Sequence, residues 1–149
     1  MRSVKVYKLF NAIITVHCIF CDIVSGKRDG HFIYEDSDHV AFLDKYPIDN
    51  GHSLVVPKKH HEKITDMEPI DVGSLFSKIP HIAGRILAAT KADAFSIAQN
   101  NGRAAKQIIP HVHVHIIPRY NDAGAVWTKR TILSDDELKA LARQIREHV

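Results

Sequence analysis

Three histidines close together in one short segment are the residues best suited to chemistry in this sequence. His111, His113 and His115 alternate with apolar residues between positions 111 and 117. In a β-strand, alternate side chains point to the same face, so the three imidazoles would share one face and the apolar residues the other. Side chains two apart lie about 7 Å from each other, so neighbouring imidazoles could contact one phosphate or metal ion. The alternatives are a strand whose histidines only face solvent, and a catalytic zinc site built from all three.

Two cysteines form a second group with chemical potential. Cys18 and Cys21 are separated by two residues, a spacing typical of a metal-binding turn or a redox pair. No alternating strand–helix–strand pattern of a thioredoxin-like redox protein surrounds them, which favours the metal site. Two cysteines are also too few for the disulfide framework of a small secreted protein.

Length and composition are those of one ordinary globular domain. The chain has 149 residues, 45% of them hydrophobic and 25% charged, with a net charge of +3. The densest basic stretch, residues 58–61, is too short for a nucleic-acid surface. Basic residues precede an apolar run from Leu9 to Val16, but that run is too short to span a membrane, and no small-residue cleavage site follows it. We therefore expect a cytoplasmic protein without membrane or nucleic-acid partners. The chain should consist of an N-terminal extension at residues 1–17 and a domain at residues 18–149. Disorder is one interpretation of the extension.

The hydrophobic pattern predicts an α+β fold that would position these residues. Alternating or β-branched segments predict five strands, at residues 31–35, 40–44, 52–57, 94–99 and 111–118. Apolar residues at helical spacing predict one long helix over 67–91, kinked at Pro80. A capping box from Ser134 to Glu137 predicts the start of a C-terminal helix. Together these elements predict a largely antiparallel five-stranded sheet with a long helix and a C-terminal helix.

The segment from His111 to Ile117 resembles the motif of the histidine triad (HIT) superfamily, in which three histidines alternate with apolar residues. Further blocks match that family in the same order, at residues 18–23, 34–36, 41–44, 51–60 and 100–102. Residues 125–127 resemble bacterial members. The resemblance covers the chain from residue 18 to its C-terminus, and it implies a HIT-like fold and an enzyme acting on nucleotides.

The resemblance also implies a structural zinc ion, one per chain. Zinc-bearing members use two cysteines, the histidine after a Pro-Lys-x sequence and the first motif histidine. In this sequence these residues are Cys18, Cys21, His60 and His111. Four nitrogen and sulfur ligands close a tetrahedral site, as structural zinc requires.

For catalysis, the resemblance implies that His113 is the nucleophile that attacks the α-phosphate. A neutral imidazole can attack phosphorus near pH 7. We expect a backbone carbonyl to accept a hydrogen bond from the N–H group of the second ring nitrogen. His115 would donate to a phosphate oxygen or the leaving group and so also contact substrate. His52 is similar to an outlying fourth histidine of the family.

The implied substrate pocket comprises further residues. Asp44 would accept hydrogen bonds from the ribose hydroxyls. Asn100 and Gln107 would donate amides to the phosphate, although Asn100 also fits a simple turn. The base slot, for which core packing is the alternative, is assigned to four apolar residues: Ile19, Phe20, Ile23 and Phe42.

The activity implied by the resemblance is hydrolysis of purine nucleoside 5′-phosphoramidates, such as adenosine 5′-monophosphoramidate, through a covalent nucleotidyl-histidine. Alternatives are a dinucleoside polyphosphate hydrolase, a non-catalytic nucleotide-binding protein and a zinc metallohydrolase. Family members often form homodimers through the long helix, so we expect one here. Three positions depart from the family pattern: Lys106 and Ile108 replace a usual glycine and hydroxyl residue, and Pro110 stands where an aromatic residue is common.

Overall fold

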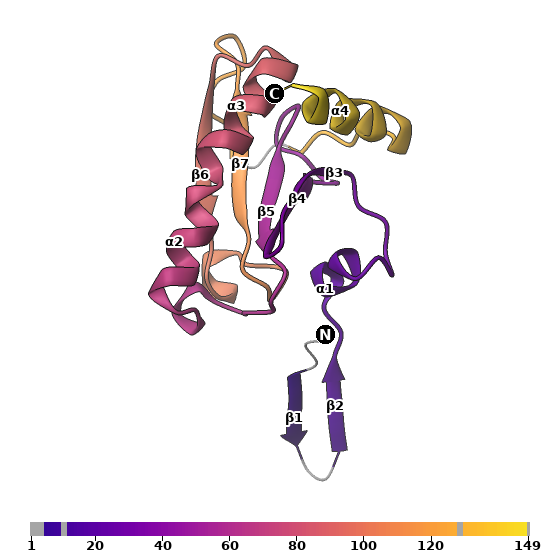
Figure 1. Cartoon of the computed structure of the whole chain (residues 1–149), viewed down its shortest axis with the longest axis vertical. Coiled ribbons are helices and arrows are strands. Elements are labelled where there is room, and N and C mark those ends of the chain that lie inside the picture. Colours follow the sequence, from indigo (N-terminus) through magenta and orange to yellow (C-terminus); the bar gives the residue numbers. More distant parts are fainter. Residues whose placement is uncertain (1–4, 10–11, 128–129, 149) are drawn as a thin grey trace.

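The computed structural model describes residues 5–9, 12–127 and 130–148, and it contains one five-stranded antiparallel sheet (Figure 1). The strand order is β3-β4-β5-β7-β6, which confirms the predicted α+β fold. The strands are β3 (Phe32–Glu35), β4 (His39–Leu43), β5 (Ser53–Pro57), β6 (Ala94–Gln99) and β7 (Val114–Arg119). The helices are α1 (Ile19–Val24), α2 (Pro69–Ser77), α3 (Ile79–Thr90) and α4 (Asp135–Glu147), with short 3₁₀ turns at Ile64–Asp66 and Arg103–Ala105.

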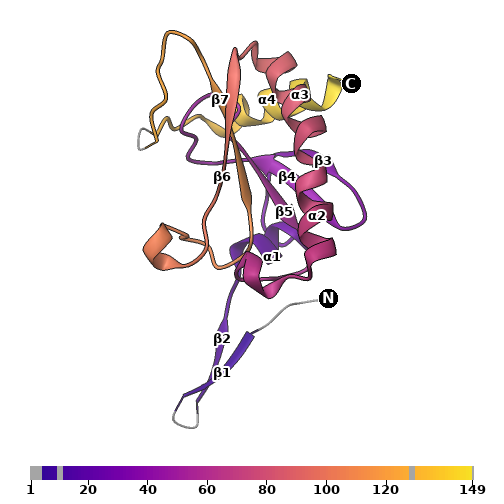
Figure 2. The same ribbon diagram turned by 90° about the vertical axis from the view of Figure 1, so that its left-hand side faces the viewer.

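Both faces of the central strands are covered, and each face packs in a different apolar cluster. Every residue of β4 and β5 is buried. Ala41, Leu43 and Val55 point into the main core beneath α2, α3 and α4. Figure 2 shows α2 and α3 running along one side of the sheet. The alternate residues Phe42 and Leu54 face the other side, where they pack in a second apolar cluster with α1. This second face carries the histidines.

The predicted long helix is present as two helices that follow one another with one residue between them. α2 ends at Ser77 and α3 begins at Ile79, with Lys78 between them. Pro80 lies in the first turn of α3, where a backbone N–H has no intrahelical partner and proline costs nothing. Lys78 itself has helical backbone angles (φ −79°, ψ −23°), so the two helices continue one another, and the predicted interruption near Pro80 is present as a one-residue break.

The histidine strand is shorter than predicted. β7 begins at Val114, so His111 and His113 precede it. Their backbone is held by loop contacts, since the N–H of His111 donates to the Ile109 carbonyl and that of Val112 to the His61 carbonyl. The predicted alternation survives this irregularity, because Val112, Val114 and Ile116 all enter the main core.

The N-terminal segment contains an antiparallel hairpin of β1 (Lys5–Leu9) and β2 (Ala12–Val16). The first four residues lie outside the described part of the chain, so the division into an extension and a domain at residue 17 stays a prediction. In the part of the chain that is described, no helix is both long and apolar enough to cross a membrane.

Candidate active site and metal site

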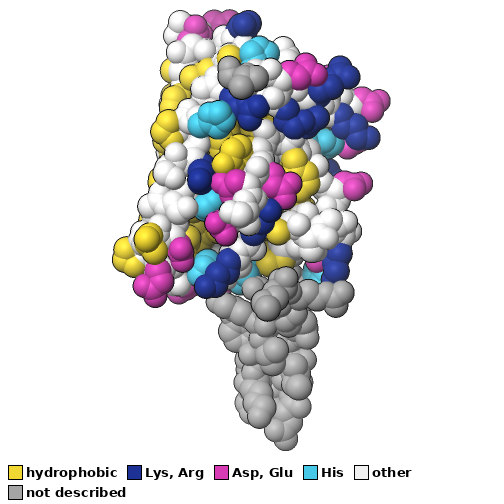
Figure 3. Space-filling model, in the orientation of Figure 1, with side chains coloured by type: hydrophobic (Ala, Val, Ile, Leu, Met, Phe, Trp, Pro, Cys, Tyr) yellow, Lys and Arg dark blue, Asp and Glu magenta, His cyan; other side chains and the backbone are white. Residues whose placement is uncertain are grey.

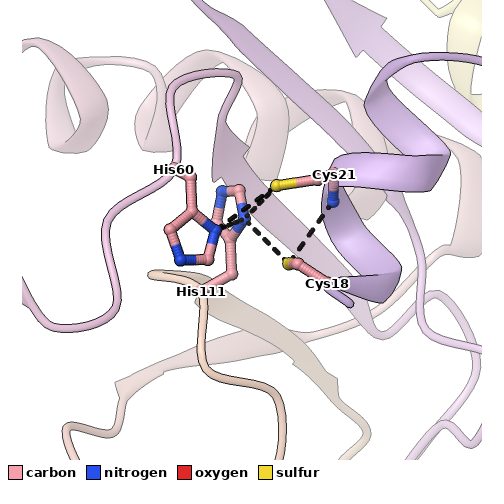
Figure 4. Close-up of side chains that lie close together, drawn as sticks. All are labelled: Cys18, Cys21, His60 and His111. Atoms are coloured by element: carbon pink, nitrogen blue, oxygen red, sulfur yellow. Dashed lines mark hydrogen bonds between the residues drawn. The ribbon is translucent and has the colours of Figure 1, made fainter. Parts of the chain in front are cut away.

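Two thiols and two imidazoles meet where α1 approaches the loops flanking the sheet (Figure 4). Cys18 caps the N-terminus of α1 and Cys21 lies one turn later, so the helix presents both sulfurs together. His60 follows the end of β5, and His111 comes from the loop before β7. The metal-binding atoms of all four residues lie within 4.8 Å of one another. Sequence reasoning had grouped these same residues.

The spacing within this cluster fits a tetrahedral ion. His111 Nδ1 lies 3.4 Å from Cys18 Sγ and 3.6 Å from Cys21 Sγ, and His60 Nδ1 lies 3.3 Å from Cys21 Sγ. The two Nδ1 atoms are 3.2 Å apart. Around a tetrahedral zinc, with bonds of about 2.0–2.3 Å, nitrogen pairs lie about 3.3 Å apart and nitrogen–sulfur pairs about 3.6 Å. The donor set and its dimensions therefore match zinc.

The protonation chemistry of the cluster also suits a cation. His111 Nε2 lies 2.8 Å from the Pro57 carbonyl oxygen, which accepts a hydrogen bond from the Nε2–H group. The lone pair of Nδ1 therefore faces the two sulfurs. Burial, opposed by that hydrogen bond and assisted by the neighbouring His60, lowers the pKa of His111 to about 4. Burial and then the Cys18 thiol raise the pKa of Cys21 to about 12. A bound cation offsets this by stabilising the thiolate.

His113 lies beside the cluster of two cysteines and two histidines, and one of its ring nitrogens donates a hydrogen bond to the backbone. Its Nδ1 is 2.7 Å from the His111 carbonyl, so Nδ1 carries the proton and the lone pair is on Nε2. This is the carbonyl contact expected from the sequence. The Phe20 ring packs edge-on against it, with ring centres 5.1 Å apart. Burial lowers the pKa of His113, which keeps the ring neutral near pH 7. A neutral imidazole with a directed Nε2 lone pair can act as a nucleophile.

A chain of hydrogen bonds fixes the proton on His115. The backbone N–H of Ile48 donates to His52 Nδ1 over 2.9 Å, which forces the His52 proton onto Nε2. That Nε2 lies 2.9 Å from His115 Nδ1, so His115 accepts there and carries its own proton on Nε2. Burial, followed by the charge of His115, lowers the pKa of His52 to about 3. Burial, followed by His113 and Arg130, lowers the pKa of His115 to about 4. Both rings are therefore neutral near pH 7.

Asp44 follows β4 and comes close to the same chain. Its Oδ1 accepts the backbone N–H of Tyr46 at 2.8 Å, and its Oδ2 lies 3.5 Å from His52 Nε2. Burial raises the pKa of Asp44, against the effect of the Tyr46 hydrogen bond and the Arg130 charge. The carboxylate keeps acceptor capacity for further hydroxyl donors.

The geometry argues against both alternative metal sites. Asp44, His52 and His115 are close enough to surround an ion, but the Ile48 N–H keeps a proton on the His52 nitrogen that would bind it. A zinc site of the three motif histidines is also excluded, because one nitrogen of His111 faces the cysteines and the other the Pro57 carbonyl.

The four apolar residues assigned to the base slot do pack together. Phe20, Ile23 and Phe42 are buried in the second apolar cluster, and Ile19 is half-buried against it. The rings of Phe20 and Phe42 meet edge-to-face at 5.4 Å. Their contact with His113 through Phe20 places this cluster next to the nucleophile. Core packing and base binding thus remain compatible for these residues.

The two predicted phosphate-contacting amides lie in the loop between β6 and β7. Gln107 is buried, and both ends of its amide bind backbone: Oε1 accepts from the Gly102 N–H and Nε2 donates to the Glu62 carbonyl. It therefore braces this loop, while one amide hydrogen remains for a ligand. Asn100 is half-buried at the end of β6. The phosphate-binding role of both residues stays a prediction.

Sequence reasoning missed two residues that shape the site. The backbone N–H of Ile48 sets the tautomers of His52 and His115, and only the three-dimensional structure could show it. Arg119 extends the alternation of His113 and His115 to the end of β7, a signal that the sequence did contain.

Comparison with known proteins identifies the family. A sequence model of the HIT domain matches residues 25–122. The chain belongs to the HIT family. It is 36% identical over 137 residues to adenylylsulfatase HINT3 of Arabidopsis thaliana, covering 89% of this chain and 69% of that protein. It is also 36% identical to adenosine 5′-monophosphoramidase hnt1 of Schizosaccharomyces pombe, covering 89% and 98%.

Solved structures of HIT proteins share the fold. A hypothetical histidine triad nucleotide-binding protein from Sulfolobus tokodaii has a TM-score of 0.80 and 36% identity, covering 88% of this chain and 91% of that one. A zinc-bound histidine triad family protein from Mycobacterium smegmatis has a TM-score of 0.78 and 35% identity, covering 87% and 90%. With relatives named as hydrolases, these matches confirm the prediction of a HIT-family enzyme.

The hydrogen-bond chain predicts that His52 sets the tautomer of His115. In His52→Ala, the Ile48 N–H and His115 Nδ1 lose their partners, so we expect a stability loss of about 2–4 kcal/mol. Long-range ¹H–¹⁵N NMR should show His115 protonated on Nε2 in the wild type and as a mixture of tautomers in the variant. His52→Gln, which keeps an amide donor and acceptor, is the matched control. An unchanged His115 tautomer in His52→Ala would contradict this role.

Proposed function

We propose that the chain hydrolyses purine nucleoside 5′-phosphoramidates at the α-phosphate through a covalent nucleotidyl-histidine on His113. The observation that carries this proposal is the His113 ring, held by the His111 carbonyl so that the Nε2 lone pair is available. The activity named for the Schizosaccharomyces pombe relative, adenosine 5′-monophosphoramidase, supports the same substrate class.

In the proposed first step, His113 Nε2 forms a bond to the α-phosphorus, and the P–N bond to the leaving amine breaks as the amine takes up a proton from the solvent. The His113 ring keeps its Nδ1 proton, and the His111 carbonyl stabilises the positive charge that develops on the imidazole. His115 Nε2–H is oriented to donate to a phosphate oxygen or the leaving group. In the second step, water attacks the phosphorus and loses a proton to the solvent, the P–Nε2 bond breaks, and its electron pair returns to His113 Nε2.

The decisive test concerns the assignment of His113 as the nucleophile. His113→Ala should abolish turnover of adenosine 5′-monophosphoramidate while leaving the fold, metal content and nucleotide binding nearly intact, because only His113 forms the covalent bond. Quenching the wild type with labelled substrate should trap an acid-labile, base-stable adduct on His113. Activity that persists in His113→Ala, without any trapped adduct, would overturn the assignment.

We also propose that Asp44 binds the ribose hydroxyls. Asp44→Ala should weaken ribonucleotide recognition by about 1.5–3 kcal/mol, seen as a rise in KM of about tenfold or more, because a charged acceptor is lost. Substrates lacking the 2′ and 3′ hydroxyls should be much less affected by the same change. An equal loss for both substrate types would show that Asp44 does not contact the ribose.

We propose that the cluster of Cys18, Cys21, His60 and His111 holds one structural zinc ion per chain. The zinc supplies no step of the reaction; it fixes α1 against the loops that end β5 and begin β7. One equivalent of zinc should co-purify, and Cys18→Ala should lower the melting temperature because a closed metal site adds to folding free energy. Protein that contains no zinc, and whose thiols titrate freely in the folded state, would refute this proposal.

We further propose that the chain forms a homodimer. β6 is an edge strand of the sheet, and Phe95 and Ile97 on it are 38% and 47% exposed. Exposed apolar side chains on an edge strand favour association with another copy. Light scattering should give twice the chain mass for the wild type, and Ile97→Lys should shift the protein towards monomer. A monomeric wild type at micromolar concentration would contradict the dimer.

We expect this enzyme to work in the cytoplasm on a small molecule. Two cysteines are too few for the disulfide framework of a small secreted protein. On the face shown in Figure 3, Lys and Arg side chains are interspersed with Asp and Glu, which supports a small anionic substrate over a nucleic acid.

A further inference from the structure

The short helix α1 takes part in two sites at once. Cys18 at its N-cap and Cys21 within it supply the two sulfurs of the metal cluster. Phe20, which lies between them, is buried and packs edge-on against the rings of His113 and Phe42, with ring centres 5.1 Å and 5.4 Å apart. Three of the four residues assigned to the base slot belong to this helix: Ile19, Phe20 and Ile23. The metal cluster and the proposed nucleotide pocket therefore share one structural element.

The position of α1 depends on its contacts with the sheet. Six residues are too few for a helix that is stable in isolation. Figure 1 shows α1 apart from the other three helices. It is joined to the sheet by its apolar side chains and by the two sulfurs, which lie between 3.3 and 3.6 Å from ring nitrogens of His60 and His111. Loss of the sulfur contacts would leave the apolar contacts alone to hold this helix in place.

The two cysteines are also placed to bond to each other. Both are free thiols, and the Cys21 N–H donates to Cys18 Sγ at 3.5 Å. Residues three apart in a helix have Cα atoms roughly 5 Å apart, and disulfides span Cα distances of about 4.4–6.8 Å. Cys18 is buried, whereas Cys21 is half-buried and therefore open to a small reagent. A disulfide between them needs little movement of the backbone.

We infer that Cys18 and Cys21 form a redox-sensitive modification site, at which a hydroperoxide converts the two thiolates into a disulfide and thereby frees α1 from the sheet. This inference rests on the proposed zinc site and on the proposed nucleotide pocket. Metal ions bind the thiolate form of cysteine, and a disulfide sulfur carries no negative charge, so the oxidised pair is lost as ligands. His60 and His111 alone do not complete the four-coordinate site that structural zinc requires.

The reaction balances with hydrogen peroxide as the oxidant. The Cys21 thiolate attacks one peroxide oxygen, the O–O bond breaks, and the departing hydroxide takes up a proton from the solvent to become water. The Cys18 thiolate then attacks the sulfur of the Cys21 sulfenic acid, the S–O bond breaks, and a second hydroxide becomes water in the same way. Two electrons pass from the sulfurs to the peroxide. A dithiol reductant reverses the change and restores both thiolates.

Release of α1 acts on nucleotide binding through the base slot. The three slot residues of α1 move with the helix, whereas Phe42 stays on β4. The Phe20 ring also loses its contact with the His113 ring. The apparent affinity for a nucleotide falls in proportion to the fraction of molecules in which α1 is docked, so docking in one tenth of them weakens binding about tenfold. Oxidation of the cysteine pair therefore lowers nucleotide binding, and its reduction in the presence of zinc restores it.

The modification is tested by adding hydrogen peroxide to the zinc-loaded wild type. We expect zinc release, measured with a colorimetric chelator, in step with the loss of both thiols and the appearance of a Cys18–Cys21 disulfide in peptide mass spectra. Dithiothreitol with added zinc should reverse these changes. Cys21→His, which keeps four nitrogen and sulfur ligands but forms no disulfide, is the matched control and should release zinc much more slowly. Zinc that stays bound in the wild type, equal release from both proteins, or oxidation that dithiothreitol does not reverse would overturn the inference.

Two further measurements test whether the disulfide frees α1. Hydrogen exchange of the amides of residues 19–24 should be faster in the oxidised protein, with β4 and β7 unchanged. AMP, used as the probe, should bind about tenfold more weakly to the disulfide form than to the reduced, zinc-loaded protein. Unchanged exchange in α1, or unchanged AMP affinity, would overturn the inference. Reduced protein that fails to bind AMP would instead refute the proposed nucleotide pocket, and the exchange of residues 19–24 would then decide by itself whether oxidation frees α1.

Discussion

The position of a single proton on each buried histidine determines what this site can do. A neutral imidazole has one donor and one acceptor, and a backbone group fixes which nitrogen is which. The His111 carbonyl holds the proton of His113 on Nδ1, and the Pro57 carbonyl holds that of His111 on Nε2. The Ile48 N–H donates to Nδ1 of His52 and so holds the His52 proton on Nε2. His52 Nε2–H in turn donates to Nδ1 of His115, which holds the His115 proton on Nε2. The result is a lone pair at His111 for a metal, a lone pair at His113 for an electrophile, and a donor at His115.

These backbone contacts depend on the sheet register and on the irregular start of β7. Because β7 begins only at Val114, the carbonyl of His111 is free of ladder hydrogen bonds and can turn to the His113 ring. The sequence predicted a strand that includes His111, whereas the structure places both His111 and His113 in the segment before β7. The metal cluster supports this arrangement, since it ties the irregular loop to α1 and to the end of β5. Local departure from strand geometry therefore helps to orient the His113 ring.

The sequence predicted which residues form the site better than it predicted the backbone contacts and element boundaries that arrange them. The strands, the sheet and the grouping of Cys18 and Cys21 with two histidines follow from periodicity and from family resemblance, which report on residue type and spacing. The exact form of the break between α2 and α3 did not follow, because a proline in a helical pattern is compatible with either a kink or a new first turn. The short α1 was also missed, since six residues are too few to show helical periodicity. Contacts made by backbone atoms, such as that of the Ile48 N–H, leave no signature in residue type.

The two ends of the histidine face place different electrostatic demands on a substrate. At the His113 end, the buried aromatic and aliphatic side chains around Phe20 form an apolar surface, of the kind that would accept the nucleobase of the proposed substrate. At the His115 end, Asp44 provides an anion, and Arg119 and Arg130 provide two cations, around the buried His52. A nucleotide bound with its phosphorus at His113 would meet this charged end with its ribose and its leaving group. Because the Arg119 side chain also anchors the loop that carries Arg130, the charge at this end depends on the same buried contact that holds the loop in place. A substitution at Arg119 would therefore remove a charge from this end of the face and also release the loop at Val126.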